Sequence, residues 1–421
     1  MGDVRAPLVV TCALVVSALA AITAPTHAEK LVRRTAAHPP PAPAPAQLDN
    51  PCVKGTGPSC TRALDGFFAA LAATEAGTAT APARISYLGD SLTADDIIAQ
   101  RLRHVLGGRF GDGGPGFLHV VPPHHYCRHR AVKRAASASW TVHGVSSPFP
   151  ADRLLGFGGA SAESQGGATA RFAPLSKRVT RAEIYYLAQP GGGKLDVAVD
   201  GKSATSIATA AAAKQAAYTQ VPVTAALARL DLAARGRVRL FGVVLEADRG
   251  VVVDNLGVVN ATAKSWGKNR RDHWQGQLAH RAPDLFVVMI GTNEASWLAG
   301  AAFAEHARVV AGLLAPVRAA NPDASCLVIS PFDQLDYEQA GAPPRASIAR
   351  MVEAQRAAAT AAGCAFWDAQ AWMGGPGSSR AWRRAGWLTN DFAHPTHEGS
   401  KRIADALAAG LLDGYAHFRK P

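Results

Sequence analysis

Ser91 is the first residue whose type and setting suggest chemistry. It stands in the block Gly-Asp-Ser-Leu at residues 89–92, after the apolar run 84–88 and before a helical pattern at 93–106. A serine there lies at the carboxyl edge of a parallel sheet, where α/β proteins place their sites. Its backbone N–H also lies near a helix N-terminus, which favours developing negative charge. Taken alone, ordinary helix capping by serine is the alternative interpretation.

Asn293 has a similar setting. Its block, Gly-Thr-Asn-Glu at residues 291–294, immediately follows the uninterrupted apolar run 285–290. The side-chain N–H of an asparagine is a neutral, directional donor that suits an oxyanion. A Gly–Asn turn without a catalytic role is the alternative.

Asp391 and His394 belong to a third block, Asp-Phe-Ala-His-Pro at residues 391–395. Their three-residue spacing lets the carboxylate reach the imidazole, fix its tautomer and stabilise the imidazolium. A loop histidine beside a capping aspartate is the alternative. His397 lies close by, but only His394 completes the pattern.

Strand and helix patterns alternate around these blocks. Strand runs at 326–329 and 364–367 alternate with helical patterns at 302–318, 345–362 and 400–412. Continuous apolar strands between amphipathic helices indicate a parallel sheet covered on both faces. Between about residues 137 and 255 the pattern changes to short alternating runs separated by turn signals, which predicts an inserted β-sandwich.

The first 28 residues have the organisation of an export signal. Arg5 precedes an apolar stretch at 6–21, and small residues end at Ala28. A single uncleaved membrane anchor is the alternative. Residues 29–63 begin with a Pro- and Ala-rich segment and are interpreted as a linker, so globular patterning starts at about residue 64.

The expected export affects how the cysteines are interpreted, because exported proteins can form disulfides. Cys52 and Cys60 flank a short loop containing Gly and Pro, which predicts a local disulfide. Cys326 and Cys364 each stand beside an apolar strand run, and buried free thiols are their default interpretation. Cys127 lies in a His-rich turn whose spacing matches no closed zinc pattern, so we predict no metal site.

The composition limits the classes of protein to which this chain can belong. The chain has 421 residues, of which 48% are hydrophobic and 18% charged, and this excludes a long disordered polymer or a multi-span membrane protein. A net charge of +12 suggests an anionic partner. Nucleic acid is disfavoured as that partner, because the chain carries an export signal and no nucleic-acid-binding motif.

In the order Ser, Asn, Asp-x-x-His, the three blocks resemble those of the SGNH (GDSL-type) hydrolases. The resemblance covers roughly residues 84–118 and 256–412 and implies a flavodoxin-like α/β sheet with a Ser-His-Asp esterase mechanism that needs no cofactor. The implied organisation is a hydrolase core at 64–130 and 256–421, split by a carbohydrate-binding-like sandwich at 131–255.

The resemblance also implies roles. Ser91 would be the nucleophile, His394 the general base and later the general acid, and Asp391 the residue that orients the imidazole. The oxyanion hole would take the Ser91 N–H and the Asn293 side chain.

A third oxyanion donor, a glycine N–H in the family, should fall within residues 256–261. Asn260 occupies the expected position, and Gly257 lies slightly upstream. A backbone N–H survives the change to asparagine, which tolerates unusual φ/ψ values better than most residues. Both residues remain candidates.

A closer resemblance narrows the substrate. The run Gly-Asp-Gly-Gly-Pro-Gly-Phe at 111–117, the β-rich insertion and the Gly-Thr-Asn-Glu block are similar to features of secreted bacterial carbohydrate O-acetylesterases, especially those acting on peptidoglycan. This implies a secreted or periplasmic enzyme that forms an acetyl-Ser91 intermediate. A lipase or thioesterase acting on longer acyl esters and a non-catalytic cell-wall-binding protein are the alternatives.

Two basic groups are expected on the catalytic face. One is the run Lys-Asn-Arg-Arg at 268–271, and the other comprises Arg380, Arg383 and Arg384. A solvated surface is their default interpretation. The hypothesis beside it is that they steer an anionic wall polymer toward the site.

Overall fold

A six-stranded, mostly parallel sheet carries the candidate site. The computed structural model describes residues 43–57 and 60–420, so the expected export signal at 1–28 and the Pro-rich segment up to residue 42 lie outside the described residues. In spatial order the strands are β1 (Leu48–Asp49), β19 (Ala365–Trp367), β18 (Ser325–Ile329), β17 (Leu285–Met289), β4 (Ala83–Gly89) and β16 (Val251–Gly257). Every neighbouring pair is parallel except β1 with β19.

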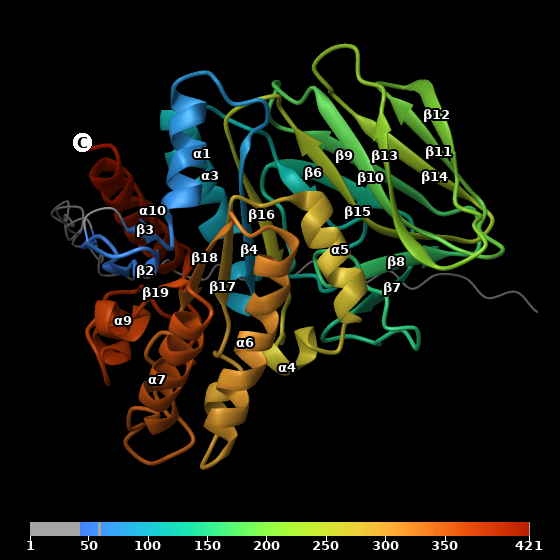
Figure 1. Cartoon of the computed structure of the whole chain (residues 1–421). Coiled ribbons are helices and arrows are strands. Elements are labelled where there is room, and N and C mark those ends of the chain that lie inside the picture. Colours follow the sequence, from blue (N-terminus) through green and yellow to red (C-terminus); the bar gives the residue numbers. More distant parts are fainter. Residues whose placement is uncertain (1–42, 58–59, 421) are drawn as a thin grey trace, which may run out of the picture. The chain divides into compact units, whose positions relative to one another are not determined.

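Helices cover both faces of this sheet (Figure 1). One buried cluster contains side chains of α1 (Asp65–Glu75), α3 (Ile97–Phe110) and α10 (His397–Phe418). The other contains side chains of α5 (Arg271–Arg281), α6 (Ala302–Ala320) and α7 (Ala346–Ala361). Val287 faces the first cluster, whereas Phe286 and Val288 face the second, because successive strand residues point to opposite faces. The predicted doubly covered α/β sheet is confirmed.

The β-rich insertion forms two antiparallel sheets around a buried apolar core. They run β13-β10-β15-β8-β7, with β5 added on β15, and β12-β11-β14-β9-β6. Their bounds are β5 (Gly116–Leu118), β6 (Val132–Ala136), β7 (Thr141–Gly144), β8 (Ala160–Ser164), β9 (Thr169–Pro174), β10 (Arg181–Ala188), β11 (Lys194–Val199), β12 (Lys202–Ala208), β13 (Gln215–Val221), β14 (Leu230–Arg235) and β15 (Val238–Glu246). Figure 1 shows these strands, mostly green, beside the parallel sheet.

The boundaries between the parts differ from the expected ones. β16 pairs with β4, so the parallel sheet resumes at Val251 rather than after residue 255. β5, from the stretch assigned to the first half of the core, pairs with β15 of the insertion. β1 belongs to the sheet although it falls within the expected linker at 29–63. Core and insertion therefore share strands at their junction.

A buried ion network fastens this junction. Arg281 is 2% exposed and contacts Glu246 Oε1 and Asp254 Oδ1, each at 2.7 Å. The Phe117 N–H of β5 donates to Asp254 Oδ1 at 2.8 Å. Burial opposes ionisation of Glu246, but the guanidinium groups of Arg281 and Arg84 outweigh it and lower the pKa of Glu246 to about 2. The network therefore holds charged partners from the parallel sheet, the insertion and α5 together.

Two disulfides are present among the described residues. Cys52 and Cys60, whose pairing the sequence predicts, are bonded to each other across the hairpin of β2 (Cys52–Lys54) and β3 (Thr61–Arg62). The interpretation of Cys326 and Cys364 as free thiols is wrong, because they form the second disulfide. The parallel register that sets Leu327 opposite Ala365 brings these preceding residues together, with a Cα–Cα distance of 4.8 Å.

None of the helices in the described ranges is long and apolar enough to cross a membrane.

Candidate active site

Ser91 is positioned by a tight strand-to-helix turn. β4 ends at Gly89, and the Asp90 carboxylate caps the short helix α2 (Ser91–Ala94). A Cβ on Gly89 would lie 2.3 Å from Thr93 Oγ1, so glycine allows the helix to fold back this closely on the strand. The turn presents the partly exposed Ser91 at the carboxyl edge of the parallel sheet.

Asp391 is held in a compact loop just before α10. Phe392 has φ 56°, a left-handed conformation that is unusual for this residue type. The loop lets the N–H groups of Ala393 and His394 donate to Asp391 Oδ1 at 3.0 and 2.9 Å, and the Thr389 hydroxyl donates to the same oxygen at 2.6 Å. With Oδ1 satisfied in this way, Oδ2 is directed to the imidazole.

The structure brings the predicted serine, histidine and aspartate together. His394 Nδ1 donates to Asp391 Oδ2 at 2.8 Å, and His394 Nε2 lies 2.8 Å from Ser91 Oγ. With the proton on Nδ1, Nε2 is the acceptor for the serine hydroxyl proton. This arrangement has the geometry of a nucleophile, its base and the group that orients the base.

The electrostatics of the site favour a basic imidazole. The hydrogen bond with Asp391 raises the pKa of His394, burial opposes this, and the negative charges of Asp391, Asp90 and Asp95 add to the rise. For Asp391, burial favours the neutral acid, but hydrogen bonds from the ring and backbone of His394 and from Thr389 outweigh it and hold the pKa of Asp391 well below its usual range. Asp391 is therefore ionised when His394 accepts a proton.

Asn293 is in place to offer a hydrogen-bond donor. One N–H of its side chain donates to the Ala261 carbonyl at 2.9 Å, and this fixes the amide. The second N–H of an asparagine amide remains available. The residue follows β17 by four positions and precedes the 3₁₀ turn η2 (Glu294–Ser296).

The backbone contacts of Gly257 and Asn260 distinguish these two candidates for the third oxyanion donor. Gly257 is excluded, because its N–H donates to Asn255 Oδ1 at 3.0 Å inside β16. Asn260 is exposed, has φ 61°, and its N–H meets no acceptor within the described ranges. The left-handed conformation is one that asparagine adopts more readily than most residues.

Glu294 and Thr389 are two contributors that the sequence did not assign. The Glu294 side chain, 1% exposed, accepts from the Ala263 N–H at 2.8 Å and so ties α4 (Ala263–Trp266) to the Asn293 block. Burial raises the pKa of Glu294 to about 7. Glu294 is the last residue of the Gly-Thr-Asn-Glu block and Thr389 lies two residues before Asp391, and this proximity is the only sequence signal for either of them.

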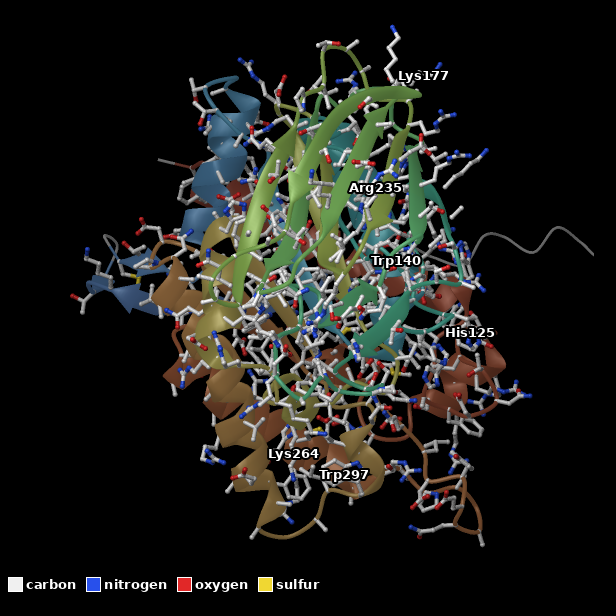
Figure 2. The ribbon with its side chains drawn as sticks, turned by 90° about the vertical axis from the view of Figure 1, so that its right-hand side faces the viewer. His125, Trp140, Lys177, Arg235, Lys264 and Trp297 are labelled. Atoms are coloured by element: carbon white, nitrogen blue, oxygen red, sulfur yellow. A yellow bond between two sulfur atoms is a disulfide. The ribbon has the colours of Figure 1, made fainter. Side chains whose placement is uncertain are left out.

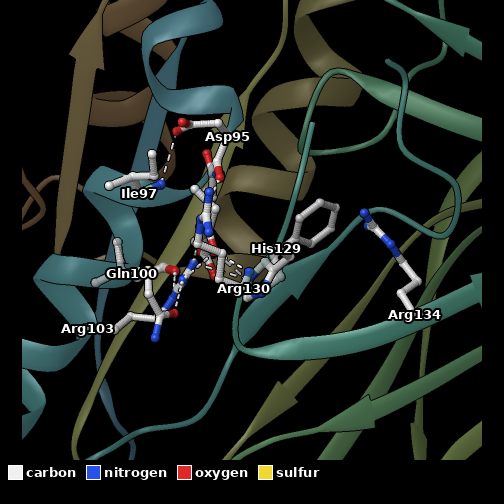
Figure 3. Close-up of polar contacts among 12 residues, drawn as sticks. Asp95, Ile97, Gln100, Arg103, His129, Arg130 and Arg134 are labelled. Atoms are coloured by element: carbon white, nitrogen blue, oxygen red, sulfur yellow. Dashed lines mark hydrogen bonds and ion pairs between the residues drawn. The ribbon is translucent and has the colours of Figure 1, made fainter. Parts of the chain in front are cut away.

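A loop at residues 122–130 lies against the nucleophile's helix. The Arg128 N–H donates to the Ala94 carbonyl of α2 at 2.8 Å. The buried Asp96 carboxylate binds the Arg103 guanidinium through two contacts of 3.0 Å and accepts from the Arg130 N–H at 2.6 Å. Figure 3 shows Arg103, His129 and Arg130 gathered at this point. The charge network therefore anchors the loop one turn beyond Ser91.

The His-rich part of this loop contains three aromatic rings in mutual contact. His124, His125 and Tyr126 lie with ring centroids 4.1 to 5.6 Å apart, and Cys127 is buried and unpaired. Across the described part of the chain, no three histidine, cysteine or acidic side chains gather in a way that would hold a metal ion.

The two basic groups differ in their environment. In the first, Arg270 pairs with Asp272 at 2.9 Å, whereas Asn269 is buried and Arg271 is exposed. In the second, on α9 (Ser379–Arg384), Arg380 donates to the carbonyls of residues 341 and 342 at 2.7 and 2.6 Å. Arg380 therefore braces the loop after β18.

Comparison with known proteins gives a family match and a match in fold. Residues 207–402 match the family described as GDSL-like Lipase/Acylhydrolase, a stretch that contains Asn293, Asp391 and His394 but not Ser91. No curated protein matches the chain.

A solved structure described as a peptidoglycan O-acetylesterase in action matches with a TM-score of 0.72 at 23% identity, over 84% of this chain and 96% of its own. A match of this extent includes part of the β-rich insertion. Two other structures, a lipase/acylhydrolase from Enterococcus faecalis and an acetylxylan esterase from Geobacillus stearothermophilus, both match with TM-scores of 0.29. Their identities are 16% and 19%, over 39% and 38% of this chain and 77% and 73% of their own.

Proposed function

We propose that this chain, a member of the SGNH (GDSL-type) hydrolase superfamily, is a secreted serine esterase that removes O-acetyl groups from a carbohydrate polymer. The observation that carries the proposal is the continuous hydrogen-bonded arrangement of Ser91, His394 and Asp391 beside the Asn293 amide. These groups come from three separate segments and meet at one edge of the sheet, where neither capping nor turn formation would require them to meet.

In the acylation half of the proposed reaction, Ser91 Oγ attacks the acetyl carbonyl carbon while His394 Nε2 takes the hydroxyl proton. The carbonyl oxygen becomes an oxyanion, which the N–H groups of Ser91, Asn260 and the Asn293 side chain stabilise. The C–O bond to the sugar then breaks, and His394 returns its proton to the departing sugar oxygen. The products are acetyl-Ser91 and the free carbohydrate hydroxyl.

In the second half, a water molecule attacks the acetyl carbon of acetyl-Ser91 and gives a proton to His394. The second tetrahedral intermediate uses the same oxyanion donors. Its collapse releases acetic acid, which ionises to acetate, and the imidazole proton returns to Ser91 Oγ. Throughout both halves Asp391 stays ionised and stabilises the imidazolium, in agreement with the direction of its pKa shift.

Three observations support the acetylated carbohydrate and the extracellular location. The structural match described as a peptidoglycan O-acetylesterase extends over 84% of this chain. Two disulfides are typical of proteins that fold outside the reducing cytoplasm. The sequence pattern of residues 1–28 is that of an export signal.

The test is acetate release from a panel of O-acetylated polymers, namely peptidoglycan, xylan and pectin, by the full chain. Acetate release from peptidoglycan at a higher kcat/KM than from the other two is the expected result. Release from none of them, together with preferred hydrolysis of decanoate over acetate p-nitrophenyl esters, would replace this function with the long-chain esterase alternative. Binding to peptidoglycan without any ester hydrolysis would instead favour a wall-binding protein.

A further inference from the structure

A tight turn at residues 258–261 carries the Asn260 N–H, the candidate for the third oxyanion donor. The Ala261 N–H donates to the Val258 carbonyl at 3.1 Å and closes the turn. Asn260 is the third residue of the turn and has φ 61°, a backbone conformation that glycine adopts freely and asparagine at some cost. The turn therefore depends on the contacts around it to keep this shape.

The first half of the turn is held by the core and by the β-rich insertion. The Val258 N–H donates to the carbonyl of Gly89, at the end of β4, at 3.2 Å. The Ser146 hydroxyl donates to the Val259 carbonyl at 2.5 Å. These two contacts fix the position at which the chain enters the turn from β16.

The second half of the turn is held by two neighbouring side chains of the block that follows β17. The Asn293 amide donates to the Ala261 carbonyl at 2.9 Å. Glu294 Oε1 accepts from the Ala263 N–H at 2.8 Å, and the Glu294 side chain is buried. Because Ala263 is the first residue of α4, Glu294 fixes the direction in which the chain leaves the turn.

The capping of α4 does not provide this hold. Thr262 and Ser265 form a capping box within the first turn of the helix, which shapes the helix end and ties it to no other segment. Figure 2 shows Lys264 of α4 near Trp297, which ends η2. The hydrogen bond to Glu294 therefore connects the capped end of α4 to the block after β17.

The position of this turn affects two oxyanion donors. The Asn260 N–H belongs to the turn itself. The Ala261 carbonyl engages one N–H of the Asn293 amide, and this contact directs the other N–H. A displacement of the turn by about 1 Å would misplace both donors, and an error of that size is enough to lower a rate on the order of 10²-fold.

We propose that Glu294 is a positioning residue that holds the Asn260 N–H and the Asn293 amide in the geometry of the oxyanion hole. It acts through the Ala263 N–H, at the far end of the turn from β16. This rests on the proposed function, because the oxyanion forms only during ester hydrolysis. The contact requires an acceptor oxygen at the reach of a glutamate side chain, and it does not require substrate.

The test compares substitutions at residue 294 in the full chain by kcat and KM for p-nitrophenyl acetate. Glu294→Ala removes the acceptor, so kcat should fall about 10²-fold with KM nearly unchanged, because the donors stabilise the oxyanion more than the bound ester. Glu294→Gln keeps an acceptor oxygen at the same reach and should retain at least about a tenth of the wild-type kcat. Glu294→Asp is one methylene shorter and should have a lower kcat than Glu294→Gln. If Glu294→Ala fails to fold, this last comparison decides, and an equal kcat for Gln and Asp would overturn the proposal.

Asp284→Ala is the matched control. Asp284 lies directly before β17, at the opposite edge of the sheet from Ser91, and its Oδ2 accepts from the Arg84 N–H at 2.8 Å. Its substitution removes a similar hydrogen bond between a carboxylate and the backbone, so it should lower the free energy of unfolding without lowering kcat. An equal loss of kcat in Glu294→Ala and Asp284→Ala would overturn the proposal, and so would a rise in KM at unchanged kcat.

Asn260→Gly tests whether Glu294 acts through the turn. Glycine keeps the N–H and adopts positive φ without the cost that asparagine bears, so the turn needs less support from its surroundings. Adding Asn260→Gly to Glu294→Ala should raise kcat about 3-fold, a larger gain than the same substitution gives in the wild-type chain. Equal gains in the two backgrounds, or no recovery, would show that Glu294 does not act through Asn260.

Hydrogen exchange distinguishes failure of this inference from failure of the proposed function, because it requires no turnover. The amides of residues 261–263 should exchange faster in Glu294→Ala than in the wild-type chain or in Asp284→Ala. Faster exchange in a chain that hydrolyses no ester would support the hold on the turn and overturn the proposed function. Acetate release by the wild-type chain, with wild-type exchange and kcat in Glu294→Ala, would retain the proposed function and overturn this inference.

Discussion

Ser91 Oγ lies 2.8 Å from Nε2 of His394, although 303 residues separate the two in the sequence. The proximity arises because β4 ends directly before Ser91 and the loop before α10 closes over the same edge of the sheet. Insertion of the β-rich part between these segments leaves the edge intact, since its chain leaves and re-enters the core through β5, β15 and β16. The site therefore forms because the sheet topology brings distant segments together, and not because its residues are close in the sequence.

Asn293→Ala should lower kcat for p-nitrophenyl acetate by about 10²–10³-fold, because the lost amide donor stabilises the oxyanion more than the substrate carbonyl. KM should change little. Asn321→Ala is the control, since Asn321 ends α6 at the amino edge of the sheet, away from Ser91. An unchanged kcat in Asn293→Ala would remove Asn293 from the oxyanion hole.

The pH dependence of kcat/KM reports the protonation state of the His394 imidazole. Activity needs neutral His394, so it should fall as the pH drops through the pKa of His394, which lies above its ordinary value of 6.5 because of Asp391. Asp391→Asn removes the charge that raises this pKa, so the acid limb should move to lower pH while kcat falls on the order of 10²–10⁴-fold. Measuring kcat/KM for p-nitrophenyl acetate from pH 4 to 9 tests the acid limb of the wild-type chain and its shift in Asp391→Asn. An unmoved acid limb would show that Asp391 does not set the pKa of His394.

The Cys326–Cys364 disulfide closes a segment with a sequence separation of 38. Its removal in Cys326→Ala/Cys364→Ala should lower the free energy of unfolding by about 3–4 kcal/mol, chiefly by freeing the unfolded chain. Urea denaturation followed by tryptophan fluorescence measures this. Cys127→Ala is the control for loss of a buried sulfur without loss of a cross-link. Equal stability of the double variant and Cys127→Ala would contradict a stabilising bridge.

The sequence predicts the blocks better than it predicts their surroundings. Ser91 and Asn293 each follow a strong apolar run, the Asp391–His394 pair precedes a helical pattern, and the structure places all four at one edge. The contact between Thr389 and Asp391 depends on the exact backbone of a loop, with Phe392 at φ 56°, and no periodic pattern encodes it.

In the other parts of the fold, the register between strands is the main information that the sequence alone does not provide. β16 is the edge strand of the parallel sheet and has seven consecutive buried residues, yet it follows short β-rich runs, and the sequence pattern groups its first residues with them. Pairing of β18 with β19 in register is what joins Cys326 to Cys364. Gly257 similarly lies close to the expected oxyanion position in sequence, but its N–H donates to the side-chain oxygen of Asn255, a local contact that the sequence pattern does not predict.

Acetate release from O-acetylated peptidoglycan by the full chain and its Ser91→Ala variant is the direct measurement of whether Ser91 deacetylates a cell-wall carbohydrate. The wild-type chain should release acetate, and Ser91→Ala should do so at least about 10³-fold more slowly, because removal of the nucleophile leaves only binding and the oxyanion donors. Unchanged circular dichroism would show that the variant is folded. Acetate release by Ser91→Ala at the wild-type rate would show that Ser91 is not the nucleophile.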